Sequence, residues 1–457
     1  MIRIVQFGEG NFLRAFVDTY FDTLNKEGYG PYAVTIVKPI PFGNLDAFYR
    51  QKNAYHTVLR GCDASGAVEN IYPISVVDSV IDPFLDYESY IALARDAELS
   101  LIVSNTTEAG IVCSDEDRAD DFSSLTYPAK LTLFLYERFK CGLGGVVLLP
   151  CELIDQNATR LAECVDFYIE KFNLGEDFYN FNKANNVYLN TLVDRIVSGF
   201  PRDEEVRENL FSRIGQRDEL LAIAEPFGLW AIERGKGVEN LIVGGRHNID
   251  VVITDDINYY KKRKVRVLNG AHTGMVPMAL HYGKTFVADA MADAKTRTFL
   301  MHTLSEIIPY VSERTEDTEA FARDVLIRFE NPYLNHSLVS ILLNSVSKWQ
   351  ARNMPSLLDF YADRGTLPTY LTYGLAYLVA LYSTAERRTD GTYAAKTLAG
   401  EITLVDDEKY LAHFANGKDM REFLLSYFPK QLTEIPTLLE SVVDYASRIL
   451  AGEELGL

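Results

Sequence analysis

Three polar residues with different chemistry lie close together in the segment KVRVLNGAHT: Lys264, Asn269 and His272. On a helix Asn269 and His272 would be neighbours, and His272 would lie two turns beyond Lys264 on an overlapping face. A lysine shielded from water beside other cations can lose its proton near neutral pH and then accept one from an alcohol. An amide donor can stabilise the alkoxide that forms. The spacing suits alcohol oxidation, and it is also common among surface and satisfied core residues.

A glycine turn near the N-terminus, FGEGNFLRAF, follows an apolar run and opens a helical pattern. Gly8 permits a tight turn, and Gly10 lets the backbone approach a pyrophosphate at the positive helix N-terminus. Leu13 replaces the usual third glycine, so the motif alone fits an ordinary strand-to-helix turn equally well. If the turn binds a dinucleotide, we expect the contacts to come from Phe7, Gly8, Gly10, Asn11, Phe12 and Arg14.

Two further segments bear on the dinucleotide. The region after the second expected strand reads VKPIP and lacks the carboxylate that usually holds the adenosine ribose. Lys38 in this region could favour a 2′-phosphate, so the local sequence leaves NAD and NADP open. The segment SNTTE follows another expected strand. Its Thr106, Thr107 and Glu108 could line the cofactor crevice or cap the next helix.

The elements that position these segments differ between the two halves of the chain. The first 150 residues alternate short apolar runs with amphipathic ones, a pattern typical of buried parallel strands between helices. The sequence therefore predicts an α/β fold with an N-terminal Rossmann-like doubly wound sheet. The expected strands are Ile2–Phe7, Ala33–Val37, Leu101–Ser104 and Gly145–Pro150, and the first helix is Phe12–Lys26.

Long helical patterns dominate from about residue 265 onward. They predict a mainly α-helical C-terminal domain with helices at Glu319–Phe329, Leu338–Trp349, Leu371–Thr384 and Leu438–Leu450. A chain of 457 residues exceeds the size of one hydrophobic core, so two domains are expected. We place a Rossmann-like NAD-binding domain at 1–255 and a helical substrate and catalytic domain at 256–457.

Composition excludes several classes of protein. The net charge of −19 disfavours nucleic acid and anionic membranes as partners. The five cysteines form no CxxC pair, and the seven histidines form no HExxH pair, so neither a disulfide framework nor a metal site is expected. No stretch has the apolar length of a membrane span or a secretory leader. These features favour a compact cytoplasmic protein, and they leave its oligomeric state open.

Four segments together resemble the mannitol dehydrogenase family, the polyol-specific long-chain dehydrogenases. KVRVLNGAHT resembles the family's Lys-x4-Asn-x2-His motif, and GEGNFLRAF its GxGxFxRA cofactor turn. YLNTLVDRI resembles its N-S-M-V-D-R-I signature, and CELIDQN stands where the mannitol enzymes carry C-D-N-I-P-x-N-G. The matches follow family order from about residue 4 to residue 352.

The resemblance implies NAD-dependent hydride transfer between an alcohol and its ketone, without a metal. It implies that Lys264 is the catalytic base, that Asn269 and Asn157 stabilise the oxyanion, and that His272 orients the substrate hydroxyl. Asp194 becomes a substrate contact together with Arg195, although an internal ion pair between these two residues is an equal alternative.

The segments are most similar to members of the family that act on hexuronates, so the implied substrate is a small sugar acid. An acidic chain must supply a local cation for that carboxylate. Lys348 and Arg352 recur with Asn344 every four residues along the expected helix Leu338–Trp349, on a face that could equally be solvated. Other family substrates, such as mannitol or its phosphate, and a non-catalytic dinucleotide-binding regulator remain alternatives.

Overall fold

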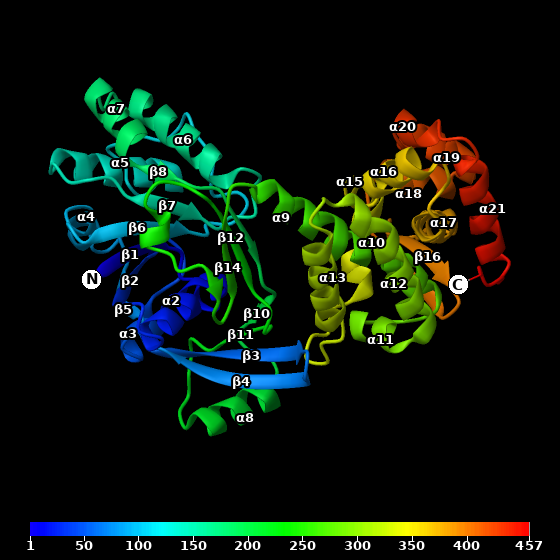
Figure 1. Ribbon diagram of the computed structural model, residues 1–457, viewed down its shortest axis with the longest axis horizontal. Coiled ribbons are helices and arrows are strands. Elements are labelled where there is room, and N and C mark those ends of the chain that lie inside the picture. Colours follow the sequence, from blue (N-terminus) through cyan, green and yellow to red (C-terminus); the bar gives the residue numbers. More distant parts are fainter. Residues whose placement is uncertain (457) are drawn as a thin grey trace. The chain divides into compact units, whose positions relative to one another are not determined.

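The computed structural model describes residues 1–456 and divides the chain into two compact units (Figure 1). Unit 1 comprises Met1–Gly61 and Ser65–Ile257. Unit 2 comprises Cys62–Ala64 and Asn258–Leu457. Unit 1 is built on a parallel sheet and unit 2 is mainly helical, so the predicted fold class is confirmed.

The main sheet of unit 1 has the strand order β5-β2-β1-β6-β7-β8, with all neighbours parallel. The order reverses direction between β1 and β6. In open parallel sheets this reversal opens a crevice beyond the carboxyl ends of the strands, where ligands bind. The strands are β1 (Ile2–Phe7), β2 (Tyr32–Val37), β5 (Val77–Ile81), β6 (Leu99–Ser104), β7 (Val147–Pro150) and β8 (Val187–Tyr188).

Both faces of the main sheet are covered, because alternate residues of its buried strands enter two separate cores. Ile4 packs with α2 (Val17–Lys26), whereas its neighbour Val5 packs with α4 (Tyr87–Ala94) and α5 (Tyr127–Lys140). Helices α6 (Asn157–Lys171) and α7 (Glu176–Asn185) complete the second face. The four predicted strands are present, with ends shifted by at most two residues.

The predicted helix Phe12–Lys26 is wrong in one respect, since the chain forms two helices there. α1 (Asn11–Arg14) ends before α2 begins, and Phe16 between them leaves the helical region with φ −128° and ψ −75°. The break turns the Phe16 ring onto Phe12 at 5.1 Å between centroids and toward Trp230 at 5.9 Å. The apolar spacing could not reveal it, because the same residues are buried with or without the break.

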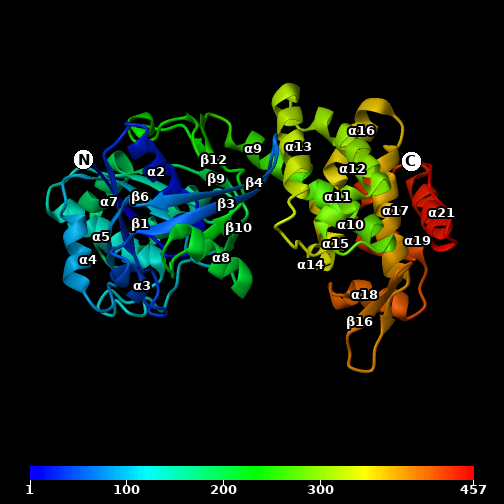
Figure 2. The same cartoon turned by 90° about the horizontal axis from the view of Figure 1, so that it is seen from below.

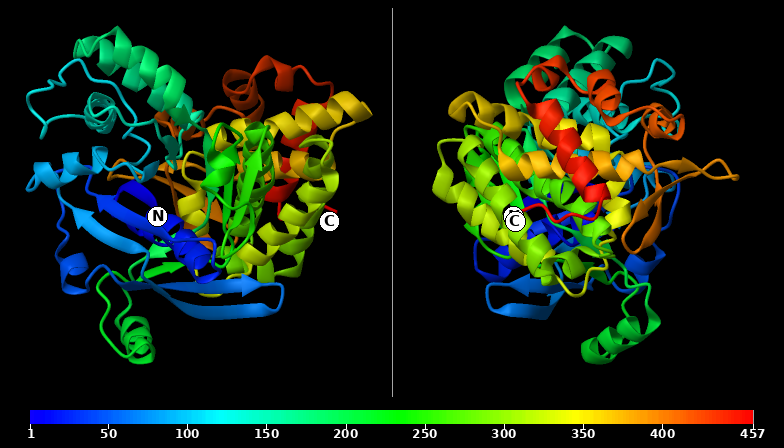
Figure 3. Two further views of the ribbon diagram at one scale, coloured as in Figure 1. Left: turned by 60° about the vertical axis from the view of Figure 1, so that its left-hand side comes forward. Right: turned by 90° about the vertical axis from the view of Figure 1, so that its right-hand side faces the viewer.

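Two smaller sheets in unit 1 were not predicted, since most of their strands are too short to give a periodic signal. One has the order β10-β11-β3-β4 and contains the long β3–β4 hairpin, blue in Figures 1 and 3; the other has the order β13-β14-β12-β9. The first sheet consists of β10 (Val197–Gly199), β11 (Ala222–Ala224), β3 (Tyr55–Asp63) and β4 (Gly66–Ile74). The second consists of β13 (Gly245–Arg246), β14 (Asp250–Thr254), β12 (Leu229–Glu233) and β9 (Thr191–Asp194).

Unit 2 is organised around α10 (Gly270–His281), whose residues are buried from Gly270 to Leu280. This helix packs against several neighbours, and Figure 2 shows it among the helices of unit 2. An apolar surface all round a helix is the mark of a core element. The surrounding helices are α12 (Ala294–Ile307), α14 (Leu338–Leu342), α15 (Ser345–Arg352) and α17 (Thr369–Ser383).

The other helices of unit 2 include α13 (Thr315–Phe329), α16 (Met354–Arg364), α18 (Glu408–Ala415), α19 (Met420–Tyr427) and α21 (Leu438–Leu450). The predicted helix 438–450 is confirmed with both of its ends. Strands are scarce, as expected; a small sheet is formed by β15 (Glu386–Arg387), β16 (Tyr393–Thr397) and β17 (Gly400–Leu404).

The predicted helix Leu338–Trp349 is wrong, because α14 and α15 are separate helices. Asn344 between them is left-handed with φ 55°, and its N–H donates to the carbonyl of Val405 at 3.1 Å. Asparagine tolerates this conformation better than most residues, so it permits the break. Asn344 therefore caps α15, while Lys348 and Arg352 follow on α15 one turn apart.

Gly145 gives a direct test of how unit 1 is packed. A Cβ on Gly145 would collide with the backbone carbonyl of Asn185, whereas a Cβ on Gly144 would meet nothing within 4 Å. We expect Gly145→Ala to lower the free energy of unfolding by about 1–3 kcal/mol. Gly144→Ala should change it by about 0.5 kcal/mol or less. Urea denaturation of both variants checks this, and equal stabilities would contradict the packing.

Candidate active site

The glycine turn lies at the reversal point of the main sheet. Gly8 adopts φ +129°, a region that L side chains rarely enter, and a Cβ on it would lie 3.1 Å from the carbonyl oxygen of Asn105. Its N–H donates to Val37 at 3.1 Å. A Cβ on Gly10 would meet nothing within 4 Å, so this backbone faces open space. The turn therefore fits the close approach of a dinucleotide pyrophosphate.

Arg14 lies beneath this turn with 7% of its surface exposed. Its Nε donates to the carbonyl of Glu9 at 3.1 Å, its Nη2 to Oδ1 of Asn11 at 2.7 Å, and its Nη1 to the carbonyl of Leu220. Burial lowers the pKa of the guanidinium. These contacts stabilise the turn from inside the protein. From the sequence alone, this role of Arg14 looks the same as the expected contact with the cofactor.

The segment after β6 divides into an engaged part and an exposed part. The N–H and Oγ1 of Thr106 both donate to Oε1 of Glu152 at 2.9 Å, and Ser104 donates to Oε2 of Glu152 at 3.1 Å. Thr107, with φ 73°, and Glu108 are exposed. No role was predicted for Glu152, because its residue type does not reveal that it follows β7 and accepts hydrogen bonds from residues at the end of β6.

Asn157, at the start of α6, is buried and engaged at both ends of its amide. Its Nδ2 donates to the carbonyls of Pro150, Glu152 and Thr191 at 2.9–3.1 Å. Its Oδ1 accepts the N–H of Thr191 at 3.0 Å and that of Ala158 at 2.9 Å. The side chain thus ties β7 to β9, and donation to an oxyanion would require one of these bonds to change.

Arg195 is also bonded to the backbone of unit 1. Its guanidinium donates to the carbonyls of Ala15 and Phe227 at 2.9 Å and of Asn248 at 2.7 Å. Asp194, the last residue of β9, is 4% exposed and pairs with Leu229 of β12 in the sheet register. The substrate contacts expected of Asp194 and Arg195 remain predictions.

Lys264 and Asn269 stand at the two ends of a π-helical segment in unit 2, Lys264–Asn269, that leads into α10. In an α-helix, residues five apart lie about 140° apart around the axis. Hydrogen bonding from i to i+5 in a π-helix brings such residues toward one line. The wider segment therefore aligns the lysine with the amide, and both side chains are half-buried. The segment is helical, as the sequence analysis considered, but its first part is a π-helix.

His272 lies in the first turn of α10 and is 8% exposed. Its ring stacks on Phe329 with centroids 3.9 Å apart, and the edge of His336 lies 5.2 Å away. Burial, then the charges of His336, Arg328, Arg352 and Lys348, lower its pKa well below the usual value, so the imidazole is neutral. Among residues 1–456 its Nε2 has no hydrogen-bond partner, which leaves that atom available for a ligand hydroxyl.

Lys348 and Arg352 bring positive charge to the same part of unit 2. Nη1 of Arg352 donates to Oγ1 of Thr273, the neighbour of His272, at 3.0 Å. Nζ of Lys348 donates to the carbonyl of Ile341 at 2.9 Å. Burial lowers the pKa of both cations, the charge of Arg352 lowers that of Lys348 further, and the charge of Asp406 partly offsets this for Lys348. Within the described chain no carboxylate forms an ion pair with either side chain.

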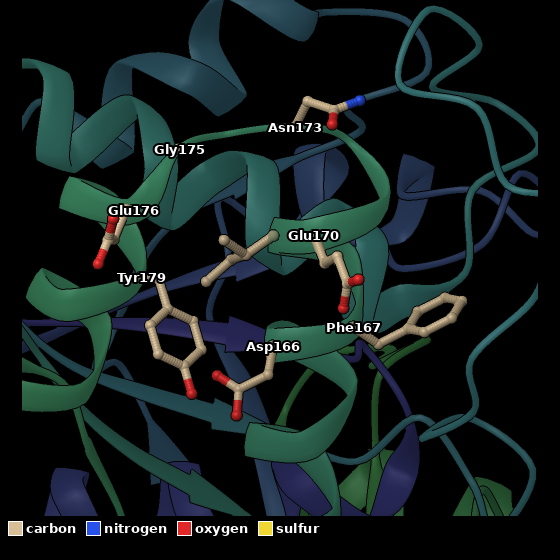
Figure 4. Close-up of a pocket in the computed structure, with 8 residues that line it drawn as sticks. Asp166, Phe167, Glu170, Asn173, Gly175, Glu176 and Tyr179 are labelled. Carbon is tan, nitrogen blue, oxygen red and sulfur yellow. The ribbon is translucent and has the colours of Figure 1, made fainter.

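A pocket of about 590 Å³ lies elsewhere in unit 1, between α6 and α7 (Figure 4). α6 begins at the carboxyl end of β7 and runs back along the sheet. Its later part, which lines the pocket, therefore lies toward the amino ends of the strands, away from the glycine turn. Lys183 already pairs with Asp166 of the pocket and lies over the ring of Tyr179 at 5.5 Å. The pocket is lined by Asp166, Phe167, Ile169, Glu170, Asn173, Gly175, Glu176 and Tyr179.

Two searches of the described residues bear on other kinds of site. In residues 1–456 no group of three or more histidine, cysteine or acidic side chains is placed to hold a metal ion. Over the same residues, no helix combines the length and the apolar character needed to cross a membrane.

Comparisons with known proteins match the chain over most of its length. Residues 2–243 match the model of the mannitol dehydrogenase Rossmann domain, and residues 256–424 match that of the mannitol dehydrogenase C-terminal domain. Altronate oxidoreductase of Shigella flexneri is 38% identical over 464 residues, which covers 98% of this chain and 94% of that protein. The enzyme of the same name from Escherichia coli O1:K1 is also 38% identical, over 459 residues.

Two solved structures share the fold. A D-sorbitol dehydrogenase in substrate-free form superposes with a TM-score of 0.78 at 19% identity, covering 98% of this chain and 92% of that one. The ternary complex of Pseudomonas fluorescens mannitol 2-dehydrogenase with NAD and D-mannitol has a TM-score of 0.65 at 18% identity, covering 98% and 91%. With both domain models and full-length relatives in agreement, this chain belongs to the mannitol dehydrogenase family.

Proposed function

We propose that this chain is an NAD-dependent oxidoreductase that reduces D-tagaturonate to D-altronate, reversibly and without a metal, in hexuronate catabolism. The observation that carries the proposal lies in unit 2. Lys348 and Arg352, which lack acidic partners among residues 1–456, lie beside the neutral His272 and close to the segment of Lys264 and Asn269. Full-length relatives that are altronate oxidoreductases support the same assignment.

The proton chemistry is assigned to the π-helical segment. Bound NADH supplies the hydride that converts the ketone to an alkoxide. Lys264, in its ammonium form, gives a proton to that oxygen, and in the reverse direction its neutral amine accepts the proton from the alcohol. The amide of Asn269 donates to the same oxygen and stabilises the negative charge. Asn157 is proposed as a second donor if one of its backbone bonds is exchanged.

His272 is assigned to substrate orientation. Because the buried imidazole is neutral, one ring nitrogen can donate and the other can accept. Its stacking on Phe329 fixes the plane of the ring. A hydroxyl of the sugar can therefore bond to Nε2 in one direction only, which positions the keto carbon relative to Lys264. Substrate contacts from Asp194 and Arg195 in unit 1 belong to the same proposal.

The substrate carboxylate is assigned to Lys348 and Arg352. A half-buried cation that forms no close ion pair has lost part of its hydration, and an incoming carboxylate relieves that cost. Arg352 offers a planar guanidinium that is already oriented by Thr273, and Lys348 adds a second charge one turn away. A neutral sugar could accept hydrogen bonds from this pair but would gain no charge–charge attraction, which favours a sugar acid over mannitol or fructose.

Three alternative functions agree less well with these observations. Fructuronate also carries a carboxylate and is the nearest competitor. Mannitol 1-phosphate could also bind Lys348 and Arg352, through its phosphate group in place of a carboxylate. A non-catalytic dinucleotide-binding regulator would not require Lys264, Asn269 and His272 together.

The choice of substrate can be measured directly. In an assay that follows loss of NADH absorbance, we expect kcat/KM to be highest for tagaturonate among tagaturonate, fructuronate, fructose and fructose 6-phosphate. The pair of cations accounts for the preference over uncharged fructose, and the preference over fructuronate rests on the relatives that are altronate oxidoreductases. Faster turnover of fructose would favour a polyol dehydrogenase, and no turnover of any substrate would favour the regulator.

Lys264→Ala tests the proton transfer. We expect kcat to fall by about 10²–10⁴-fold, the contribution typical of a general acid or base, while NADH affinity changes by less than about threefold. The exposed neighbour Lys262 is the matched control, and Lys262→Ala should retain turnover. Stopped-flow rates and NADH fluorescence titration separate the two effects. Near-normal turnover of a folded Lys264→Ala variant would remove this residue from the mechanism.

Lys348→Met and Arg352→Met test the carboxylate site. Each substitution should reduce the ratio of kcat/KM for tagaturonate to that for fructose by about ten- to a hundredfold, the value of one charge-assisted hydrogen bond. Lys418→Met, which removes an exposed cation paired with Glu422, should leave the ratio unchanged. Thermal melting verifies folding. An unchanged ratio in both folded site variants would place the carboxylate elsewhere.

A further inference from the structure

The adenosine side of the dinucleotide site shows an arrangement of charges that the sequence did not predict. β1, β2 and β5 are neighbours in the sheet, so the residues that follow them meet at one edge. Lys38 directly follows β2, and Asp82 directly follows β5. The backbone holds them level, since the N–H of Lys38 donates to the carbonyl of Ile81 at 3.1 Å.

Lys38 is fully engaged within unit 1. Its Nζ forms an ion pair with Oδ2 of Asp82, donates to the carbonyl of Gly43 at 3.1 Å and lies 5.7 Å from the centre of the Phe84 ring. The side chains of Lys38 and Asp82 are only 3% and 9% exposed. A buried pair of this kind has already exchanged its hydration for mutual contact. The lysine is therefore not available to a second anion while Asp82 is charged.

The second buried cation of this edge, Lys130, is held by a backbone carbonyl and an aromatic ring. Nζ of Lys130 donates to the carbonyl of Pro39 at 3.0 Å and lies 4.6 Å from the centre of the Phe84 ring. Burial lowers the pKa of this amine to about 8, so most of it stays protonated at neutral pH, but only 4% of the residue is exposed and little of that charge is open to a ligand.

A further carboxylate, that of Glu9, stands in the glycine turn itself. Burial raises the pKa of Glu9, while its own backbone amide and the charges of Lys38 and Arg14 lower it. Asp82 is close enough to raise it as well. A Cβ on Gly43 would lie 3.9 Å from Oε1 of Glu9, so this carboxylate faces the same loop that accepts from Lys38. The edge therefore presents two carboxylates and a lysine that is already paired.

We propose that Asp82 makes this site selective for NADH by holding Lys38 in an ion pair, with Glu9 as the carboxylate that faces the adenosine ribose. In most domains of this kind a single carboxylate follows the second strand, and this chain has Lys38 at that position. Asp82 and Glu9 together would take over the function of that carboxylate. The inference concerns the dinucleotide and rests on the proposed function only in assuming that the glycine turn binds one.

The physical reason is the charge of the 2′-phosphate of NADPH. It would stand against Glu9 and Asp82, and Lys38, which could neutralise it, is already paired with Asp82. The ribose 2′-hydroxyl of NADH carries no charge and can donate to a carboxylate. Removing the negative charge of Asp82 while keeping its shape frees Lys38 to pair with the phosphate.

The test measures binding of NADH and NADPH to the full chain by fluorescence titration, without any sugar acid. We expect the wild type to bind NADH at least about tenfold more tightly than NADPH. Asp82→Asn should shift the affinity ratio toward NADPH by about ten- to a hundredfold, the value of a charge-assisted hydrogen bond. Adding Lys38→Met to Asp82→Asn should abolish that shift, because Lys38 is its cause.

Asp78→Asn is the matched control. Asp78 lies on β5 four residues before Asp82, but it is exposed and pairs with Arg3, so its loss should leave the ratio unchanged. If Asp82→Asn fails to fold in thermal melting, Glu9→Gln provides the second variant and should shift the ratio about three- to tenfold toward NADPH.

Two results would overturn the inference. Equal binding of both dinucleotides by the wild type, or an unchanged ratio in folded Asp82→Asn and Glu9→Gln with NADH binding intact, rules out the selective role of these carboxylates. Binding of neither dinucleotide would instead remove the proposed function, and the inference with it.

Discussion

The burial of α10 is the constraint on which the catalytic half of the chain depends. The helix has no solvent face, so each neighbour must approach its backbone closely. Gly270 and Gly274 make this possible. A Cβ on Gly270 would lie 2.7 Å from Oδ1 of Asn353, and a Cβ on Gly274 would lie 3.1 Å from its Nδ2. Asn353, the residue that precedes α16, thus rests on the first turns of α10.

This close packing fixes the position of the chemistry. Asn269 immediately precedes Gly270, and His272 follows it within the same turn, so the backbone that carries both side chains is held by the packing of the helix. Dense interiors transmit strain rather than absorb it. The π-helical segment ends where this rigid helix begins. The alignment of Lys264 with Asn269 is therefore set by backbone hydrogen bonding against a fixed support, and not by flexible side chains alone.

The sequence predicted the elements whose burial leaves a periodic signal. β1 and α21 were found with both of their ends, because apolar runs bounded by turn residues leave little choice. The breaks at Phe16 and Asn344 were missed, since the same side chains are buried on either side of each break. The π-helical segment could not be seen either, because one extra residue per turn does not alter which residue types occur.

The site was harder to predict than the fold, because residue type does not reveal whether a polar side chain bonds to the protein backbone or remains open to a ligand. Arg14, Asn157 and Arg195 were all expected to contact ligands, and the structure bonds each to several backbone groups within unit 1. Lys348 and Arg352 look no different in the sequence, yet they are half-buried beside His272. Only the partners of a side chain, which depend on tertiary contacts, separate a structural cation from one that can bind a substrate.

Charge shows how an acidic chain can still be suited to an acidic substrate. The net charge of −19 acts over the whole surface and is screened by salt within about 10 Å. Near His272, burial reduces that screening and lowers the pKa of Lys348 and Arg352, which means that the fold keeps two cations in an unfavourable setting. A carboxylate placed there gains the interaction that the cations lack. At the adenosine edge the fold has the opposite arrangement, because Lys38 is already paired and an added phosphate gains nothing. The same principle, whether a buried charge has its partner, thus attracts an anion to one site and rejects it at the other.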